Sequence, residues 1–160
     1  MKRLNRHEIL QELSSKWEES GKRHLYLVLG DYKELVALER DLVSHARTPD
    51  RHQLKRPLGV NGCLLNRMPE AEQERLVGWE AKYEDAIRQR LTKEFEELLT
   101  EAFSENSIVI LKDMELLFGF NLDLALLRLH ATNGKHILLL LPGHREGERI
   151  VLFHEADEVF

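Results

Sequence analysis

The chain is poor in cysteine, and Cys63 is its only thiol among 160 residues. A single cysteine excludes an intrachain disulfide and any C-x-x-C zinc motif. The lack of disulfides is typical of a reducing compartment, so we expect a cytoplasmic protein. Because no histidine or acid pattern surrounds Cys63, we interpret it as a buried apolar side chain.

Long apolar runs are also missing. The longest uninterrupted run is residues 137–141, whereas a membrane-spanning helix needs roughly 20 apolar residues, so no membrane partner is expected. The start of the chain, residues 1–8, is charged and no apolar segment follows it, which is not typical of a secretory signal.

Complete catalytic motifs are a third absence. None of the eight histidines belongs to an H-E-x-x-H motif, and no serine belongs to a G-x-S-x-G motif. The formal net charge of -5 gives no general affinity for nucleic acid. The sequence therefore predicts no catalytic residue, no cofactor and no metal ligand with a full motif behind it.

What the sequence does contain is an alternation of strand and helix patterns. Nearly continuous apolar runs predict buried strands at residues 24–29, 108–111 and 136–141. A short strand is expected at residues 63–65, and a last strand at 149–153 is close enough to form an antiparallel edge hairpin. We expect a single three-layer α/β domain over residues 1–160, with a mostly parallel sheet flanked by helices.

Helices are indicated by caps and by periodicity. Asn5 with Glu8, and Asp31 with Glu34, have the spacing of a capping box at the start of a helix. The strongest helix is predicted over residues 80–103, where one apolar face is formed by Tyr83, Ile87, Leu91, Phe95, Leu98 and Ala102.

The predicted strands at residues 24–29 and 108–111 look like the frame of a nucleotide-binding fold whose phosphate loop is missing. In a P-loop protein the first strand leads into G-x-x-x-x-G-K-[ST], and a later strand ends on a magnesium-binding acid. Here Lys33 follows Gly30 by three positions instead of six, and Glu34 takes the place of the hydroxyl residue. We interpret Asp31 and Glu34 as helix caps whose charge repels phosphate, which makes the Walker A motif degenerate.

Two weaker sites stay open as alternatives. Asp113 and Glu115 follow a buried strand, where open α/β sheets often bind ligands, although Asp113 also suits the N-cap of the next helical turn. A divergent ATPase using Lys33 and Asp113 is the alternative function that these residues leave open.

The second weak site is a basic loop. Nucleic acid is the partner that its cations suggest, and a solvated surface is the competing interpretation, since no aromatic residues interleave with them for stacking. The four cations are Arg47, Arg51, Lys55 and Arg56.

Part of the chain resembles a known family. Residues 108–118 read I-V-I-L-K-D-M-E-L-L-F and resemble the strand-D-x-E-[LI]-L-F segment of the small P-loop-like proteins of BREX phage-exclusion systems (BrxF). Residues 136–153, with Leu141-Pro142-Gly143 and a final Leu-Phe, resemble the end of another small BREX component, BrxB. BrxF-like proteins keep a Walker A loop, which this chain lacks.

The resemblance implies a cytoplasmic component of bacterial anti-phage defence. Such a component would be a non-enzymatic interaction subunit that binds larger protein partners, with any nucleic-acid contact indirect. The acidic long helix and the edge strand at residues 149–153 are the surfaces we expect partners to use, because exposed strand edges invite pairing.

Overall fold

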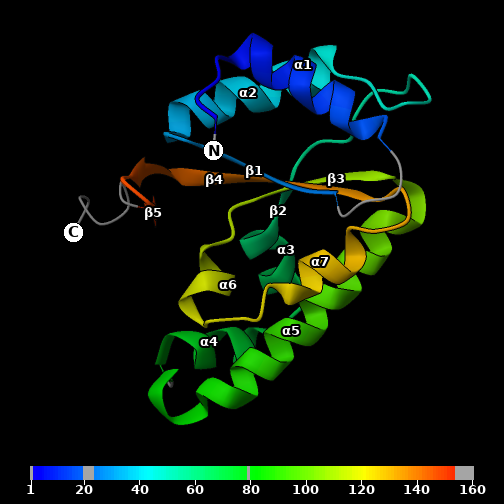
Figure 1. Ribbon diagram of the computed structural model, residues 1–160. Helices are drawn as coiled ribbons and strands as arrows, with labels where there is room; N and C mark the ends of the chain where they lie inside the picture. Colours follow the sequence, from blue (N-terminus) through cyan, green and yellow to red (C-terminus); the bar gives the residue numbers. More distant parts are fainter. Residues whose placement is uncertain (1, 20–23, 79, 154–160) are drawn as a thin grey trace.

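The computed structural model describes residues 2–19, 24–78 and 80–153, and the side chains of residues 75–78 and 80–83 lie outside that description. Its elements form three layers, with α1 and α2 on one side of a sheet and α3, α5, α6 and α7 on the other (Figure 1). None of the helices in the described ranges is both long and apolar enough to cross a bilayer.

The sheet is mostly parallel, as the sequence predicts. Its strand order is β1-β4-β3-β2, and the antiparallel strand β5 pairs with β4. His136 of β4 stands beside His24 of β1 and Ile108 of β3, so the three long strands begin at one level. The strands are β1 (His24–Gly30), β2 (Leu58–Gly59), β3 (Ile108–Lys112), β4 (His136–Glu146) and β5 (Arg149–Leu152).

The first helical layer consists of α1 (Arg6–Trp17) and α2 (Tyr32–His45). Both helices begin with the capping boxes that the sequence predicts, at Asn5 and Asp31. Their apolar faces cover one side of the sheet because alternate strand residues point there. The buried residues of this layer include Leu13, Trp17, Leu38 and Leu42 from the helices, and Ile108, Ile110, Leu138 and Leu140 from the strands.

The second layer covers the other side of the sheet. It is built on α5 (Glu80–Glu105), whose Leu91, Phe95 and Leu99 are almost fully buried against Val109 and Leu139. The predicted apolar face is confirmed for Ile87 to Leu98, and the side chain of Tyr83 lies outside the described residues. The remaining helices here are α3 (Val60–Asn66), α4 (Glu70–Gly78), α6 (Glu115–Gly119) and α7 (Ala125–His130).

The prediction of a strand at residues 63–65 is wrong. These residues belong to α3, and the neighbouring strand β2 contains only Leu58 and Gly59. A three-residue apolar run fits a helix as well as a strand, and here the helical spacing buries both Val60 and Leu64. Cys63, on the same helix, is partly buried and packs against the core.

The expected end of the third long strand at Pro142 is also wrong. β4 continues through Pro142, which is in register with Gly30 of β1, and it pairs with β5 from Gly143 to Glu146. Proline is tolerated because the pairing of β4 with β3 ends at Leu139, so at Pro142 only β1 lies alongside β4 in parallel. The Pro142 carbonyl accepts a hydrogen bond from the Phe153 amide at 2.8 Å.

The pairing of β4 with β5 requires a residue without a side chain at position 143. A Cβ at position 143 would collide with the backbone carbonyl of Val151, whereas one at Gly62, inside α3, would meet open space. We expect Gly143→Ala to lower the free energy of unfolding by about 1–3 kcal/mol. Gly62→Ala should raise it by about 0.5–1 kcal/mol, because alanine favours the helix. Urea unfolding of both variants tests this, and equal effects would contradict the hairpin register.

Candidate functional site

The carboxyl edge of the parallel sheet is the place where open α/β folds usually hold ligands. β1 and β3 both neighbour β4, so their carboxyl ends lie about 10 Å apart, which is two strand spacings. The topology therefore brings the junction at Gly30 and the acid Asp113 to one edge of the sheet.

The N-terminus of α2 is closed by its own carboxylates. The Glu34 amide donates to Asp31 Oδ1 at 2.7 Å, and the Asp31 amide donates to Glu34 Oε2 at 3.0 Å. A Cβ placed on Gly30 would lie only 3.0 Å from the same Glu34 oxygen, so this carboxylate folds back over the junction. Lys33 is exposed on the same turn, and its side chain makes no hydrogen bond or ion pair within the described ranges.

Glu115 is held at this edge by two other elements. Asn61 Nδ2, from α3, donates to Glu115 Oε2 at 2.7 Å, and the Tyr32 hydroxyl, from α2, donates to Glu115 Oε1 at 3.4 Å. Asn61 also accepts the Leu116 amide at 3.0 Å, so it caps α6 from another helix. Nothing local in the sequence marks Asn61 for this role, because Glu115 lies 54 positions further along the chain and the two residues meet only in the folded protein.

The expected role of Asp113 as a helix N-cap is wrong. The N-cap position of α6 is Met114, which makes no side-chain cap, and Asn61 supplies the missing acceptor. Asp113 instead has φ of 52°, and its backbone carbonyl accepts a hydrogen bond from the backbone N–H of Asn61 at 2.9 Å. Its carboxylate is exposed, passes close to Gly59, and makes no hydrogen bond or ion pair with any described residue.

The chemistry of this edge is acidic and mostly self-satisfied. Lys112, which ends β3, forms an ion pair with Glu39 at 3.0 Å and is therefore committed to α2. No group of three or more metal-ligating side chains occurs in the part of the chain that the structure describes. The arrangement offers a phosphate two carboxylates at a helix start in place of open N–H groups.

The basic loop, residues 46–57, divides its cations. Arg47 Nη1 donates to the carbonyls of Ser44 and Ala46 at 3.2 and 2.7 Å, so Arg47 closes the end of α2. The other three predicted cations, Arg51, Lys55 and Arg56, are exposed. A nucleic-acid role for them stays a prediction.

No protein-family model, curated protein or solved structure matches the chain.

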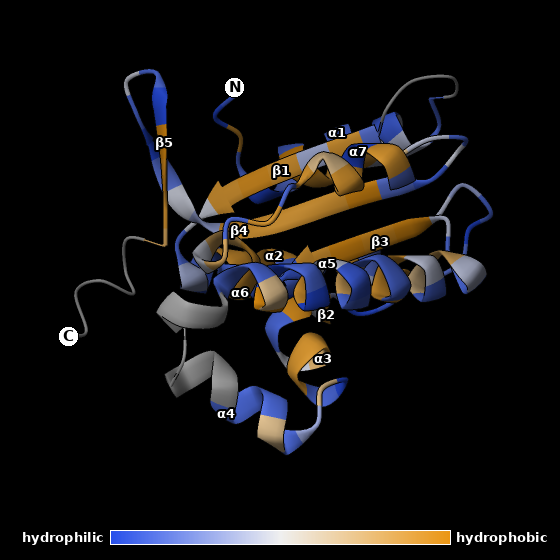
Figure 2. Ribbon diagram, turned by 90° about the horizontal axis from the view of Figure 1, so that it is seen from below, coloured by the Kyte–Doolittle hydropathy of each residue, from blue (hydrophilic) through white to orange (hydrophobic). Residues whose placement is uncertain are grey.

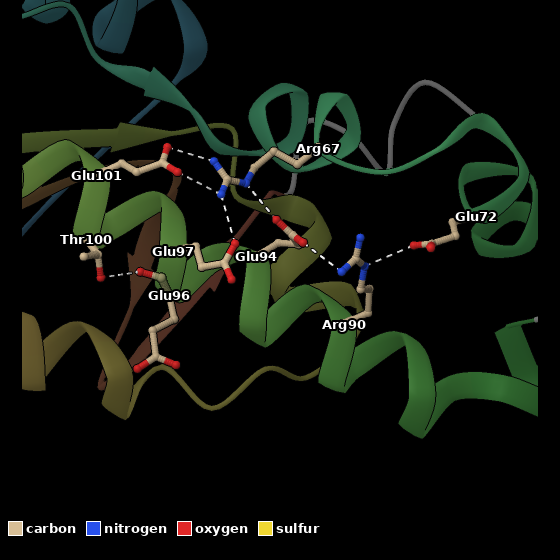
Figure 3. Close-up of polar contacts among 8 residues, drawn as sticks. All are labelled: Arg67, Glu72, Arg90, Glu94, Glu96, Glu97, Thr100 and Glu101. Carbon is tan, nitrogen blue, oxygen red and sulfur yellow. Dashed lines mark hydrogen bonds and ion pairs between the residues drawn. The ribbon is translucent and has the colours of Figure 1, made fainter.

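A second polar cluster joins α3, α4 and α5 (Figure 3). Glu94 is buried on α5 between two cations, Arg67 Nε at 2.8 Å and Arg90 Nη1 at 2.9 Å. Arg67 also binds Glu101 and Glu97, and these hydrogen bonds, with Glu101 first, raise the pKa of its guanidinium. The cluster explains how a carboxylate is buried, because both of its oxygens are paired.

This cluster also pairs several of the acidic side chains of α5 within the chain. Three acids of the helix, Glu94, Glu97 and Glu101, turn toward Arg67, and Glu96 points away from them (Figure 3). Charges already paired within the chain attract a partner weakly. The long helix is therefore a poorer partner surface than its sequence suggests.

A buried histidine pair lies at the opposite, amino end of the sheet. The rings of His24 and His136 stack with centroids 4.1 Å apart, and both side chains are buried. The Tyr26 hydroxyl bridges them, at 2.9 Å from His24 Nδ1 and 3.4 Å from His136 Nδ1. Lys16 lies over the Tyr26 ring.

The environment of the pair disfavours added charge. Burial, followed by the neighbouring His24, lowers the pKa of His136 from 6.5 to about 4. Burial, followed by the charge of Glu19, raises the pKa of Tyr26. Both shifts favour the neutral forms.

The lowered pKa of His136 makes stability depend on pH. Between pH 6.5 and 4 the unfolded imidazole binds a proton that the folded one does not, so acid favours unfolding. We expect the free energy of unfolding to fall by up to about 1.4 kcal/mol per pH unit across this window and to level off below it. His136→Phe should remove this part of the slope in urea titrations, whereas exposed His52→Asn should keep it. A wild-type slope equal to that of His136→Phe would contradict the assignment.

Proposed function

We propose that the chain is a non-catalytic, cytoplasmic subunit that binds other proteins in a bacterial anti-phage assembly of the BREX kind. The observation that carries this proposal is the closed N-terminus of α2. Glu34 and Asp31 occupy the backbone donors with which a phosphate loop would bind its anion. A nucleotide would have to displace one carboxylate and face the other.

We infer a P-loop-like frame with a degenerate Walker A motif. β1 leads into a helix through Gly30, β3 ends next to Asp113, and both strands flank β4 in parallel. A fold can keep this frame while its site changes, since function resides in side chains that the fold presents. The BREX resemblance rests on β3 with α6, and on the β4–β5 hairpin.

The β4–β5 hairpin is the surface that best suits a protein partner. It stands out from the body of the molecule in Figure 2, and its residues from His144 to Ile150 are exposed. Its base is fixed by an edge-to-face contact between Phe153 and Phe118, with centroids 5.3 Å apart. Ile150, with 48% of its surface exposed, offers an apolar anchor on a strand edge that can accept another strand.

Affinity purification from the native cell tests this proposal. We expect the tagged chain to co-purify larger defence proteins, including ATPase, methyltransferase or phosphatase-like subunits. Ile150→Asp should reduce their recovery several-fold, because it places a charge on the apolar anchor. Val36→Asp, at an exposed apolar position on α2, is the matched control. Partner recovery that is unchanged by Ile150→Asp would reject the hairpin as the binding surface.

A divergent ATPase is the second candidate, favoured by the exposed Asp113 carboxylate at the carboxyl edge. Calorimetry with Mg-ATP separates the two functions. We expect no heat of binding for the wild-type chain, because Glu34 closes the helix start. Micromolar binding that Asp113→Ala or Lys33→Ala abolishes would overturn the non-catalytic proposal. Equal traces for wild type and both variants would support it.

A further inference from the structure

β1 lies at the margin of the sheet, with β4 as its one strand neighbour among the described residues (Figure 2). Proteins usually protect such an edge with a charged side chain, a proline or a bulge. β1 has none of these: its sequence is H-L-Y-L-V-L-G, and it pairs with β4 without interruption from His24 to Gly30. The His24 amide donates to the Ala131 carbonyl, just after α7, at 3.0 Å, and β1 is otherwise an uncharged edge.

The centre of this edge exposes an apolar side chain. Leu25 and Leu29 pack against the core on the α5 side of the sheet, but Leu27, which shares their face, is 42% exposed. α7 contacts β1, and its Leu129 is 73% exposed. Two large apolar side chains are thus left open on and beside the same strand.

We propose that β1 pairs antiparallel with β1 of a second copy of this chain, about a two-fold axis through Leu27. Such an axis is perpendicular to the sheet, so each copy keeps the same faces up and down. Only residues on one face can then stand opposite each other, which restricts the axis to pass through a residue. Centring on Leu27 sets all seven residues of β1 opposite residues of the other copy, and any other centre leaves some unopposed. The His24 amide already donates to the Ala131 carbonyl at 3.0 Å, so it adds no hydrogen bond across the interface.

The chemistry of the pairs selects a second copy as the occupant. In this register Leu25 faces Leu29, Tyr26 faces Val28 and Leu27 faces Leu27, so large apolar side chains meet on both faces of the joined sheet. Because β1 has no charged residue, self-pairing places no charge against its like. This inference does not rest on the proposed function.

Sedimentation of the full chain tests the pairing. We expect a reversible dimer for the wild type. Leu27→Lys should weaken self-association by at least about tenfold, because it sets two ammonium groups opposite each other at the two-fold axis. Val36→Lys, which changes an exposed apolar residue on α2, should associate like the wild type. Circular dichroism checks that both variants are folded.

A cross-link fixes the register. In a Cys63→Ala background, Leu27→Cys should form a disulfide-linked dimer on oxidation, since facing strand residues have Cα atoms about 4.5–5.5 Å apart. Val36→Cys in the same background should not. A wild-type chain that sediments as a monomer at every concentration overturns the inference. A dimer that Leu27→Lys leaves intact and Leu27→Cys does not cross-link also overturns it.

Discussion

The fold depends on the pairing of β4 between β1 and β3. Ile137 to Leu141 are buried, and alternate members of this run enter the two apolar cores on opposite sides of the sheet. No polar side chain interrupts the run, so the strand is stable only when helices cover both faces. Once β4 is in place, β1 and β3 pair with it in parallel, and their carboxyl ends come to one edge. The position of every candidate site residue at that edge follows from this strand.

What the sequence predicts well is what local physics decides. The three long strands are continuous apolar runs, and the α2 start is a capping box complete within four residues, so neither needs knowledge of distant contacts. The run Cys63-Leu64-Leu65 is too short to indicate helix or strand by itself, and packing of Leu64 in the core favours the helix. β4 passes Pro142 because β5 gives it a new partner. Asn61 and Glu115 meet only in the folded chain, so no sequence spacing reveals their contact.

The carboxyl edge shows how a fold associated with ligands can satisfy itself. Glu34 occupies the helix start, Asn61 caps α6, and Lys112 is paired with Glu39. Each internal group is tethered within a few ångströms of its donor, so a ligand must compete with a contact that carries little translational cost. Lys33 and Asp113 differ from these groups, because the side chain of neither makes a hydrogen bond or an ion pair with another described residue. The backbone N–H of Asn61 donates to the Asp113 carbonyl, and this contact within the fold accounts for the left-handed backbone of Asp113 without a ligand.

The groups that the chain leaves open are of a different kind. Its buried polar side chains are largely paired, as Glu94 is with Arg67 and Arg90, but β1 and the projecting hairpin present strand edges with exposed Leu27 and Ile150. A strand edge binds another backbone through main-chain hydrogen bonds, and burial of an exposed apolar side chain at the contact adds a hydrophobic contribution. Neither feature distinguishes one small anion from another. The two proposals use these two edges: the uncharged β1 would pair with its own copy, and the charged hairpin would bind a different chain.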